Sequence, residues 1–316
     1  MAKASPLSGK LVTLIGGNGF LGRHVAQALL ERGARVRVAG RNPESAFSLK
    51  PLANLGQLQF ARCNAKDKRS IEAVMQSSDA AVYLVGTFAG DQEALQAKGA
   101  GLAARYAAEQ GAQSFVYISA IGADADDEQS GYARTKGLGE KLVLEAFPKA
   151  SIMRPSIIFG EEDDFTNMFA GMISNLPALP VFGADSPIQP VWVDDVAEAV
   201  AVALEDPGKH GGKRFELGGP DVITMEELHE KLAAAQDRKR SFIPVPDALG
   251  KIFAAIPFTP MNSDQFLLLK RGSTVGGKLP TIGKLGITPR PLDLFLDKWM
   301  QRYRKHGRFT KARVSS

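Results

Sequence analysis

The stretch that decides the fold is Leu11–Gly22, which reads LVTLIGGNGFLG: a strand pattern followed by a glycine-rich turn. A helical pattern begins inside the turn and continues to Arg32. In such a unit the first glycine permits a tight turn, the second lets the backbone approach a pyrophosphate, and the third lets the helix pack on the sheet. The helix N-terminus adds N–H groups and partial positive charge. The stretch predicts a dinucleotide-binding turn, with candidate contacts at Gly16, Asn18, Gly19, Phe20, Leu21, Gly22 and Arg23.

Working outward, the first half of the chain alternates strand patterns with helix patterns. After the opening strand, the strand patterns lie at 34–40, 58–63, 80–86, 114–119 and 151–156. Repeated strand–helix units imply parallel strands joined by right-handed crossovers. We therefore predict an α/β fold with a doubly wound parallel sheet, the Rossmann arrangement, and a smaller C-terminal lobe.

The regular alternation of strand and helix patterns ends after Phe159, where prolines and glycines become more frequent. Thr224 and Glu227 form a capping-box pattern for a helix that runs to about Gln236. We expect an NADP-binding Rossmann domain over 1–160, a partly interleaved α/β lobe over 161–290, and a basic amphipathic helix and tail over 291–316.

Composition excludes several classes of protein. The 316 residues are 44% hydrophobic and 23% charged, which is typical of a soluble globular chain. Cys63 is the only cysteine, so an internal disulfide and a thiolate-rich metal site are excluded. No histidine or carboxylate spacing predicts a metal. No apolar run is long enough to span a membrane, and the first ten residues are too short for a signal peptide, so we expect a reducing interior.

The net charge of +5 is concentrated at the C-terminal end. Seven basic residues and no acidic residue lie between Lys298 and Ser316, which leaves 32 basic against 34 acidic residues elsewhere. Such a tail favours an anionic partner: a lipid surface, an acidic protein face or nucleic acid. A solvated terminal helix is the alternative, and no nucleic-acid motif accompanies the tail.

The second strand pattern indicates which dinucleotide the turn would hold. An NAD site usually places a carboxylate about 20 residues after the glycines, where it binds the ribose hydroxyls. Here that position carries Gly40 and Arg41. An arginine can form charge-assisted hydrogen bonds to a 2′-phosphate, with Arg23 as a second contact, so NADP(H) is favoured. Further candidate cofactor contacts follow the later strands, namely Asn64, Val85, Gly86 and Pro155.

Tyr132 and Lys136 are the candidate catalytic pair. They stand four residues apart in a helical pattern, and therefore on one helix face. The ammonium can lower the pKa of the phenol and hold the nicotinamide ribose. Ser119 ends the preceding strand pattern and is the third candidate. Ile121 stands where a hydroxyl donor would be expected, and losing such a donor costs ~2.7–4 kcal/mol of transition-state stabilisation. Little or no turnover is therefore expected, and Tyr132 and Lys136 would serve mainly to bind the cofactor.

The GxxGxxG spacing, with YARTK after the fifth strand, resembles the extended or atypical short-chain dehydrogenase/reductase superfamily. Four later segments are more specific: RPSIIFGEEDDFTNMFA, QPVWVDDVAEAV, IPFTPMNSDQ and LGITPRPLDLFL, which begin at 154, 189, 256 and 285. With GGNGFLGR and YARTKGLGEK, they resemble the dehydrogenase-like accessory subunits of respiratory complex I (NADH:ubiquinone oxidoreductase) and their bacterial relatives. The resemblance covers nearly the whole chain.

This resemblance implies a tightly held NADPH, no established turnover, complex I subunits as partners, and no nucleic acid. It also implies peripheral contact with the cytoplasmic side of an inner membrane, or with the matrix side in an organelle. The alternatives that remain are an active NADP-dependent reductase or epimerase, acting on a quinone precursor or a nucleotide sugar, and a cofactor-gated redox sensor.

Two segments are candidates for docking to a partner. In the C-terminal segment, apolar residues at helical spacing lie beside the basic cluster, which predicts an amphipathic helix. They are Leu292, Phe295, Leu296, Trp299 and Tyr303. The second candidate is LGKIFAAIPF, residues 249–258. Ordinary core packing explains either segment equally well.

Overall fold

In the computed structural model, residues 4–256 and 261–305 are described, and they form two compact units. The first unit contains residues 1–155, 193–217 and 275–288, and the second contains 156–192, 218–274 and 289–316. The domain boundaries expected from the sequence stay a prediction. Two segments that they assign to the second lobe, 193–217 and 275–288, belong to the unit that holds the central sheet.

The first unit is built on a seven-stranded sheet in which every neighbouring pair is parallel, with the order β11-β6-β5-β4-β1-β2-β3. The predicted doubly wound fold is therefore confirmed. The chain adds strands in one direction from β1 to β3, then restarts at β4 on the other side of β1. The strands are β1 (Leu11–Ile15), β2 (Arg35–Gly40), β3 (Leu58–Arg62), β4 (Ala80–Tyr83), β5 (Ser114–Ile118), β6 (Ser151–Pro155) and β11 (Arg214–Leu217).

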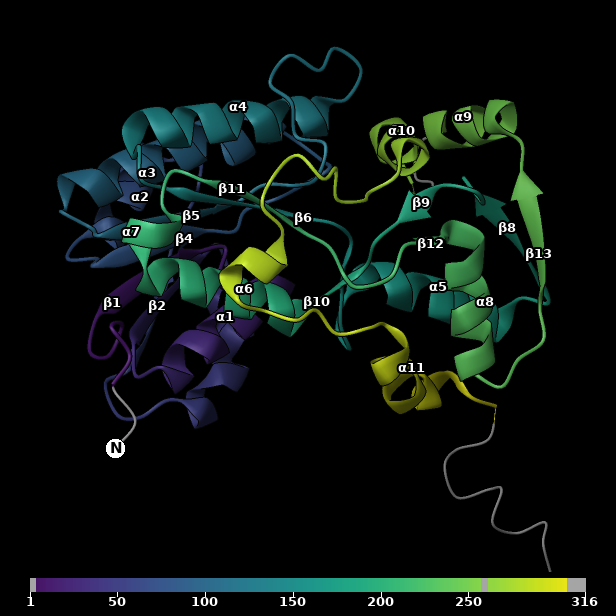
Figure 1. Cartoon of the computed structure of the whole chain (residues 1–316), viewed down its shortest axis with the longest axis horizontal. Helices are drawn as coiled ribbons and strands as arrows, with labels where there is room; N and C mark the ends of the chain where they lie inside the picture. The colour runs from purple at the N-terminus through teal and green to yellow at the C-terminus, as the bar shows by residue number, and fades with distance from the viewer. Residues whose placement is uncertain (1–3, 257–260, 306–316) are drawn as a thin grey trace, which may run out of the picture. The chain divides into compact units, whose positions relative to one another are not determined.

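Helices cover both faces of this sheet (Figure 1). On one face, α1 (Phe20–Glu31) packs against α6 (Val193–Glu205). On the other face, α3 (Gly99–Glu109) packs against α2 (Lys68–Met75) and α4 (Gly131–Ala146). Because both faces are covered, the central strands β1, β4 and β5 are buried along their whole length. The remaining elements of this unit are the 3-10 helix η1 (Pro43–Leu52), the π-helical turn η2 (Glu93–Lys98), α7 (Pro207–His210) and the 3-10 turn η3 (Ile282–Leu285).

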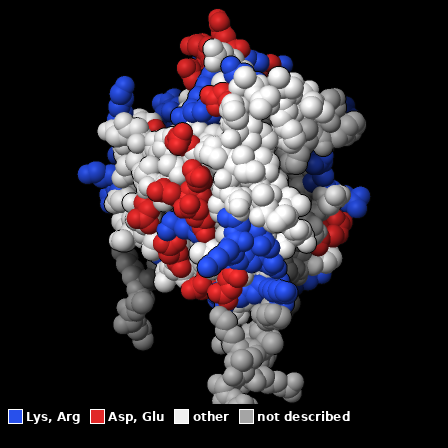
Figure 2. All heavy atoms as spheres, turned by 90° about the vertical axis from the view of Figure 1, so that its right-hand side faces the viewer, with Lys and Arg blue, Asp and Glu red and all other residues white. Residues whose placement is uncertain are grey.

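The second unit combines three small two-stranded sheets with five helices in its described residues. The pairs are β7 (Ile158–Phe159) with β10 (Val191–Trp192), β8 (Ala178–Phe182) with β13 (Ser241–Val245), and β9 (Pro187–Ile188) with β12 (Ile223–Thr224). The helices are α5 (Asp164–Asn175), α8 (Met225–Ala235), α9 (Asp247–Ala255), α10 (Ser263–Arg271) and α11 (Asp293–Trp299), followed by the 3-10 turn η4 (Met300–Tyr303). The capping box expected at the start of α8 is present. Figure 2 shows the face around β13, where a broad uncharged area borders groups of basic and acidic side chains.

The C-terminal helix is shorter than the amphipathic helix expected over 291–316. Residues 306–316 lie outside the described residues, and α11 is only seven residues long. The apolar side chains Leu296 and Trp299 are buried inside the second unit. Phe295 stacks on Trp192, with ring centroids 3.8 Å apart and an interplanar angle of 7°. Of the two interpretations left open for this segment, core packing therefore applies to the described aromatic side chains Phe295 and Trp299. Docking through the basic end stays a prediction, since part of it lies outside the described residues.

Candidate dinucleotide site

The glycine turn joins β1 to α1 beside the end of β4. Gly16 has a φ of +85°, which disfavours an L side chain, and its added Cβ would lie 3.2 Å from the Val85 backbone nitrogen. A Cβ on Gly22 would lie 2.6 Å from the Gly17 Cα. Gly16 and Gly22 are therefore required by close backbone packing alone. The turn lies where strand order reverses between β1 and β4, which is the usual position of the ligand crevice in such sheets.

Gly19 is different, because the space beside it is open. It is the N-cap of α1, and no side chain caps this helix. An added Cβ would meet only the Gly16 carbonyl oxygen, at 3.4 Å. The first backbone N–H groups of a helix have no intrahelical partner, so those of Phe20 and Leu21 suit an anionic ligand here. The predicted pyrophosphate contact itself stays a prediction.

Asn18 links the glycine turn to the loop after β2. Its Nδ2 donates to the Asn42 carbonyl oxygen and to the Ser45 Oγ, each at 3.2 Å. An added Cβ on Gly40 would lie 2.1 Å from the Asn18 Oδ1, so a side chain at position 40 would displace the Asn18 amide. Sequence reasoning missed this link, since only the register of β1 and β2 brings the two positions together.

Two arginines flank this link. Arg41 follows β2 with an exposed side chain, which makes no hydrogen bond or ion pair with residues 4–256 and 261–305. The Arg23 Nη1 donates to the Asn18 carbonyl oxygen at 3.4 Å. Arg23 thus follows the glycine turn and Arg41 precedes Asn42, and the Asn18 hydrogen bonds join these two segments. After β3, the Asn64 Oδ1 accepts from the Lys66 backbone nitrogen at 3.1 Å and closes a local turn.

Tyr132 and Lys136 lie on the first turns of α4, as the spacing predicted. The Ser130 side chain caps this helix by accepting from the Ala133 backbone nitrogen. The Lys136 Nζ donates to the carbonyl oxygens of Ile118 at 2.8 Å and of Val85 at 3.2 Å. It also lies 5.8 Å from the centre of the Tyr132 ring. A Cβ on Gly86 would be 3.5 Å from the Lys136 Nζ, so the structure brings Val85, Gly86, Tyr132 and Lys136 together.

Burial lowers the pKa of Lys136 from 10.5 to about 7, although the Glu140 carboxylate acts in the opposite direction. In the unfolded chain this lysine keeps its ordinary pKa, so between pH 7 and 10.5 the unfolded state binds more protons than the folded state. The neutral amine can still donate to both carbonyls. This group therefore adds stability as the pH rises through that window.

We expect the apoprotein to gain stability relative to Lys136→Met between pH 7 and 10, on the order of a few kcal/mol. Methionine has a similar length and no charge, so the variant removes this titration and leaves the others in place. Urea unfolding of both proteins at several pH values measures the difference. Two parallel stability curves would show that Lys136 does not titrate in this range.

Two side chains near this pair had not been predicted. The Phe88 ring stacks on the Tyr132 ring at 4.2 Å, from the loop after β4. Gln96 is fully buried, and its Nε2 donates to the Thr135 Oγ1 at 3.1 Å. The π-helical turn that contains Gln96 leaves carbonyl groups to accept from the buried Tyr83 and Tyr117 hydroxyls. No spacing in the sequence indicates either contact, since both depend on a loop and a π-turn.

Ser119, the third candidate catalytic residue, follows β5, and its catalytic role stays a prediction. Its hydroxyl is buried and donates to the Glu140 Oε1 at 2.6 Å. The same carboxylate accepts from the Arg154 Nε at 2.7 Å and Nη2 at 2.8 Å, and from the Arg214 Nε at 2.7 Å. Ile121 has no hydroxyl, and its backbone nitrogen donates to the carbonyl oxygen of Pro155 at 3.1 Å. The Ser119 hydroxyl is thus hydrogen-bonded within an ion cluster that Glu140 forms with Arg154 and Arg214.

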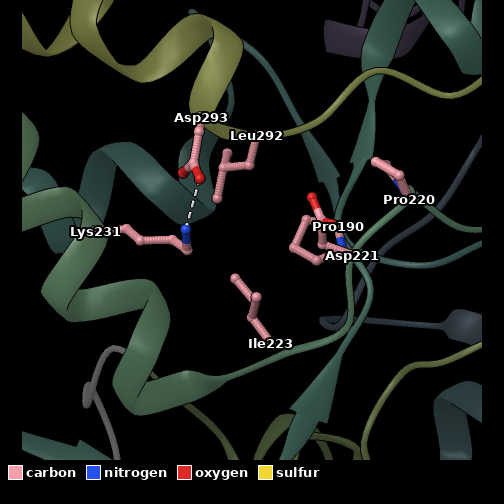
Figure 3. A pocket seen from close by; sticks show the side chains of 7 residues that line it. All are labelled: Pro190, Pro220, Asp221, Ile223, Lys231, Leu292 and Asp293. Atoms are coloured by element: carbon pink, nitrogen blue, oxygen red, sulfur yellow. Dashed lines mark hydrogen bonds and ion pairs between the residues drawn. The ribbon is translucent and has the colours of Figure 1, made fainter.

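A small hollow lies in the second unit. The hollow drawn in Figure 3 encloses about 10 Å³, which is room for a single water molecule. Lys231 and Asp293 close one side of it with an ion pair of 2.7 Å. Within residues 4–256 and 261–305, no group of three His, Cys, Asp or Glu side chains could hold a metal ion.

Comparisons with known proteins give the family. The sequence pattern of the NmrA-like family matches residues 8–268. The "NADH dehydrogenase [ubiquinone] 1 alpha subcomplex subunit 9, mitochondrial" of Mus musculus is 33% identical, over 96% of this chain and 82% of its own. The "Ceramide reductase" of Caulobacter vibrioides is 28% identical, over 75% of this chain and 74% of its own. Thermus thermophilus UDP-glucose 4-epimerase, solved in complex with NAD, shares the fold with a TM-score of 0.69 and 19% identity, over 93% and 99% of the two chains.

Proposed function

The chain belongs to the NmrA-like family, and from this premise we propose that it is an NADP(H)-holding accessory or assembly subunit of a membrane-associated NADH:ubiquinone oxidoreductase. One observation carries the proposal: the similarity to the mouse alpha subcomplex subunit covers 96% of the chain, and therefore both units. Similarity limited to the first unit would indicate only a shared nucleotide-binding fold.

The experiment that tests this proposal is co-purification. A tagged copy of the full chain, expressed in its own host, is recovered from membranes solubilised with a mild detergent. NADH:ubiquinone oxidoreductase subunits are expected in the eluate, with NADH-dependent quinone reduction. Their absence, with the tagged protein eluting alone, would contradict the assignment.

We place the protein peripherally on the cytoplasmic side of an inner membrane, or on the matrix side if the host membrane is mitochondrial. Among the described residues, no helix is long and apolar enough to cross a membrane. The mouse relative carries "mitochondrial" in its name, which supports an energy-converting membrane as the site. Protease protection of sealed vesicles of known orientation identifies the side.

The proposed cofactor is NADP(H), held in the first unit by the glycine turn and by the pair Tyr132 and Lys136. When bound, the group supplies hydride-transfer chemistry. The open space beside Gly19 and the uncapped start of α1 suit its pyrophosphate. The exposed Arg41 and the absence of a carboxylate at the end of β2 favour the 2′-phosphate over a plain ribose.

Arg41→Asp is expected to reverse the preference for NADPH over NADH. The change removes a charge-assisted hydrogen bond and adds an anion beside the 2′-phosphate, so NADPH affinity should fall roughly 10- to 100-fold. Calorimetric titration of both cofactors into wild type and variant measures this. Equal affinities of the wild-type protein for the two cofactors would refute the proposed role of Arg41.

We further propose that turnover is slight. Ile121 cannot donate a hydrogen bond to a developing oxyanion, and the Ser119 hydroxyl is engaged by Glu140. A missing donor of this kind lowers kcat by roughly 10²- to 10³-fold.

Ile121→Ser is expected to raise any residual NADPH-dependent reduction of a quinone precursor or a nucleotide sugar, because it places a hydroxyl at the position where a donor is missing. Ile121→Val is the matched control, since it changes size without adding a donor. The decrease of NADPH absorbance with each substrate gives the rate. Rapid consumption of NADPH by the wild-type protein would overturn the slight-turnover proposal.

A second candidate function is an active NADP-dependent reductase or epimerase. Two observations favour it: the Lys136 Nζ lies 5.8 Å from the centre of the Tyr132 ring on α4, and the Caulobacter relative is named as a reductase. The NADPH assay and the co-purification together separate the candidates. An active enzyme consumes NADPH without any partner, whereas an accessory subunit is recovered with its complex.

A further inference from the structure

A second pocket of the protein, with a volume of about 550 Å³, lies in the first unit and is open to solvent on one side. Its walls come from α4, from the loop after β5, and from the strands β6 and β11 at the edge of the central sheet (Figure 1). Small-molecule sites have volumes of roughly 300–1,000 Å³. Neither the glycine turn nor the pair Tyr132 and Lys136 lines this pocket, so the space is separate from the candidate dinucleotide site.

The Glu140 carboxylate lines the inner part of the pocket but has no capacity left for a ligand. Its side chain is 2% exposed. The Oε1 atom accepts from the Ser119 Oγ and the Arg154 Nε, and the Oε2 atom accepts from the Arg154 Nη2 and the Arg214 Nε. A carboxylate offers about four lone-pair sites, so these hydrogen bonds use all of them. The polar groups left for a ligand at this depth belong to the two arginines.

Arg214 is the arginine with unused donors. Its side chain is 38% exposed, and its hydrogen bond to Glu140 uses only Nε. Within the described ranges, Nη1 and Nη2 therefore have no protein acceptor. Arg154 is surrounded by negative charge instead, because Glu216 and Asp124 also attract it. The planar fork of N–H groups on Arg214 matches the two oxygens of a carboxylate.

The rim of the pocket has the opposite preference. Asp124 and Glu145 are exposed there, beside a single exposed lysine, Lys141. Glu145 makes no hydrogen bond or ion pair with the part of the chain that the structure describes. An α-helix rises 1.5 Å per residue, so Glu145 stands about 7.5 Å along α4 from Glu140. A ligand thus meets N–H donors at its inner end and an excess of carboxylates at its outer end.

We propose that this pocket binds a small zwitterion of the amino-acid class, with its carboxylate on the Arg214 guanidinium and its ammonium group toward Glu145 and Asp124. Three acidic and three basic side chains line the pocket, so their formal charges sum to zero. A ligand without net charge preserves this balance, whereas a phosphate dianion would add negative charge beside the rim carboxylates. The proposal does not depend on the proposed function, because it uses no residue of the candidate dinucleotide site.

Ligand-observed NMR titration of the full chain, at constant ionic strength, tests this with three probes of the same carbon chain. 4-Aminobutyrate carries both charged groups, butyrate only the carboxylate, and butylamine only the ammonium group. We expect 4-aminobutyrate to bind about two- to fivefold more tightly than butyrate, the usual range for an exposed ion pair. Butylamine should bind most weakly, because it offers no acceptor to Arg214. Saturating NADPH should displace none of the probes.

Arg214→Gln should weaken the binding of both 4-aminobutyrate and butyrate by about tenfold or more, because each loses charge-assisted hydrogen bonds. Lys213→Gln is the matched control, since it removes the same charge from an exposed neighbour that does not line the pocket. This control should change neither dissociation constant. Circular dichroism verifies that both variants are folded.

Glu145→Gln provides a second test at an exposed position, where the fold does not depend on the side chain. It should weaken 4-aminobutyrate by about two- to fivefold and should not weaken butyrate. This selective effect checks the proposed orientation of the ligand even if Arg214→Gln does not fold.

Several results would overturn the proposal. Absence of 4-aminobutyrate binding would do so, and equal weakening by Lys213→Gln would reduce the effect to general charge attraction. Displacement by NADPH would assign the probe to the glycine turn. Inorganic phosphate that binds more tightly than 4-aminobutyrate, and that Arg214→Gln weakens, would make the pocket a phosphate site. Each of these results leaves the proposed function to its own co-purification test.

Discussion

Replacing Glu140 by alanine is expected to lower the free energy of unfolding by about 3 kcal/mol, because it leaves the largely buried Arg154 guanidinium without its carboxylate. The Glu140 side chain is 2% exposed and binds Arg154, which is itself 16% exposed. It also accepts from Arg214 and Ser119. Urea unfolding of the apoprotein, followed by circular dichroism, measures the loss.

Glu145→Ala is the matched control, since Glu145 lies on the same helix with an exposed side chain. Surface substitutions of this kind usually change stability by less than about 0.5 kcal/mol. Ser119→Ala should cost about 1 kcal/mol, the usual value for one hydrogen bond, and should leave NADPH bound. A Glu140→Ala protein within 1 kcal/mol of the wild type would mean that water replaces the carboxylate and that the cluster is not buried in solution.

This ion cluster shows why part of the site could not be predicted. Glu140 stands 14 residues from Arg154 and 74 from Arg214, and β6 and β11 are neighbours only in the folded sheet. Ser119 follows β5 at the position where a catalytic hydroxyl was sought, and only the structure reveals its buried acceptor. Motif spacing identifies residues that act locally, whereas a buried pair reflects the tertiary arrangement of strands.

The strand–glycine–helix unit and the Tyr132–Lys136 spacing could be predicted, because both are local in sequence. Alternating patterns also gave the parallel sheet, since each crossover helix follows its strand directly. The C-terminal segment could not be interpreted in the same way. Helical spacing shows that one face is apolar, but it does not tell whether this face meets the chain's own core, as Phe295 and Trp299 do, or remains exposed, as Leu249 and Ile252 do.

Gly19→Val is expected to abolish cofactor binding while the fold survives. At Gly19 the backbone has φ −76° and ψ 177°, which any L residue can adopt, and the added Cβ would meet only one atom, at 3.4 Å. The branched side chain would instead occupy the open space proposed for the pyrophosphate. Affinity for NADPH should fall at least about a hundredfold, equivalent to ~2.7 kcal/mol.

Thermal unfolding with and without NADPH separates this effect from simple destabilisation. A ligand at 100 times its dissociation constant stabilises a protein by about 2.7 kcal/mol, so the wild type should gain a higher melting temperature and Gly19→Val should gain none. Gly171→Ala on α5, where an added Cβ meets nothing within 4 Å, should respond to NADPH as the wild type does. Gly22→Ala should lower the melting temperature even without ligand, because its Cβ would overlap the Gly17 backbone. A Gly19→Val protein that still retains NADPH through gel filtration would exclude the glycine turn as the pyrophosphate site, since no other effect of this substitution reaches the ligand.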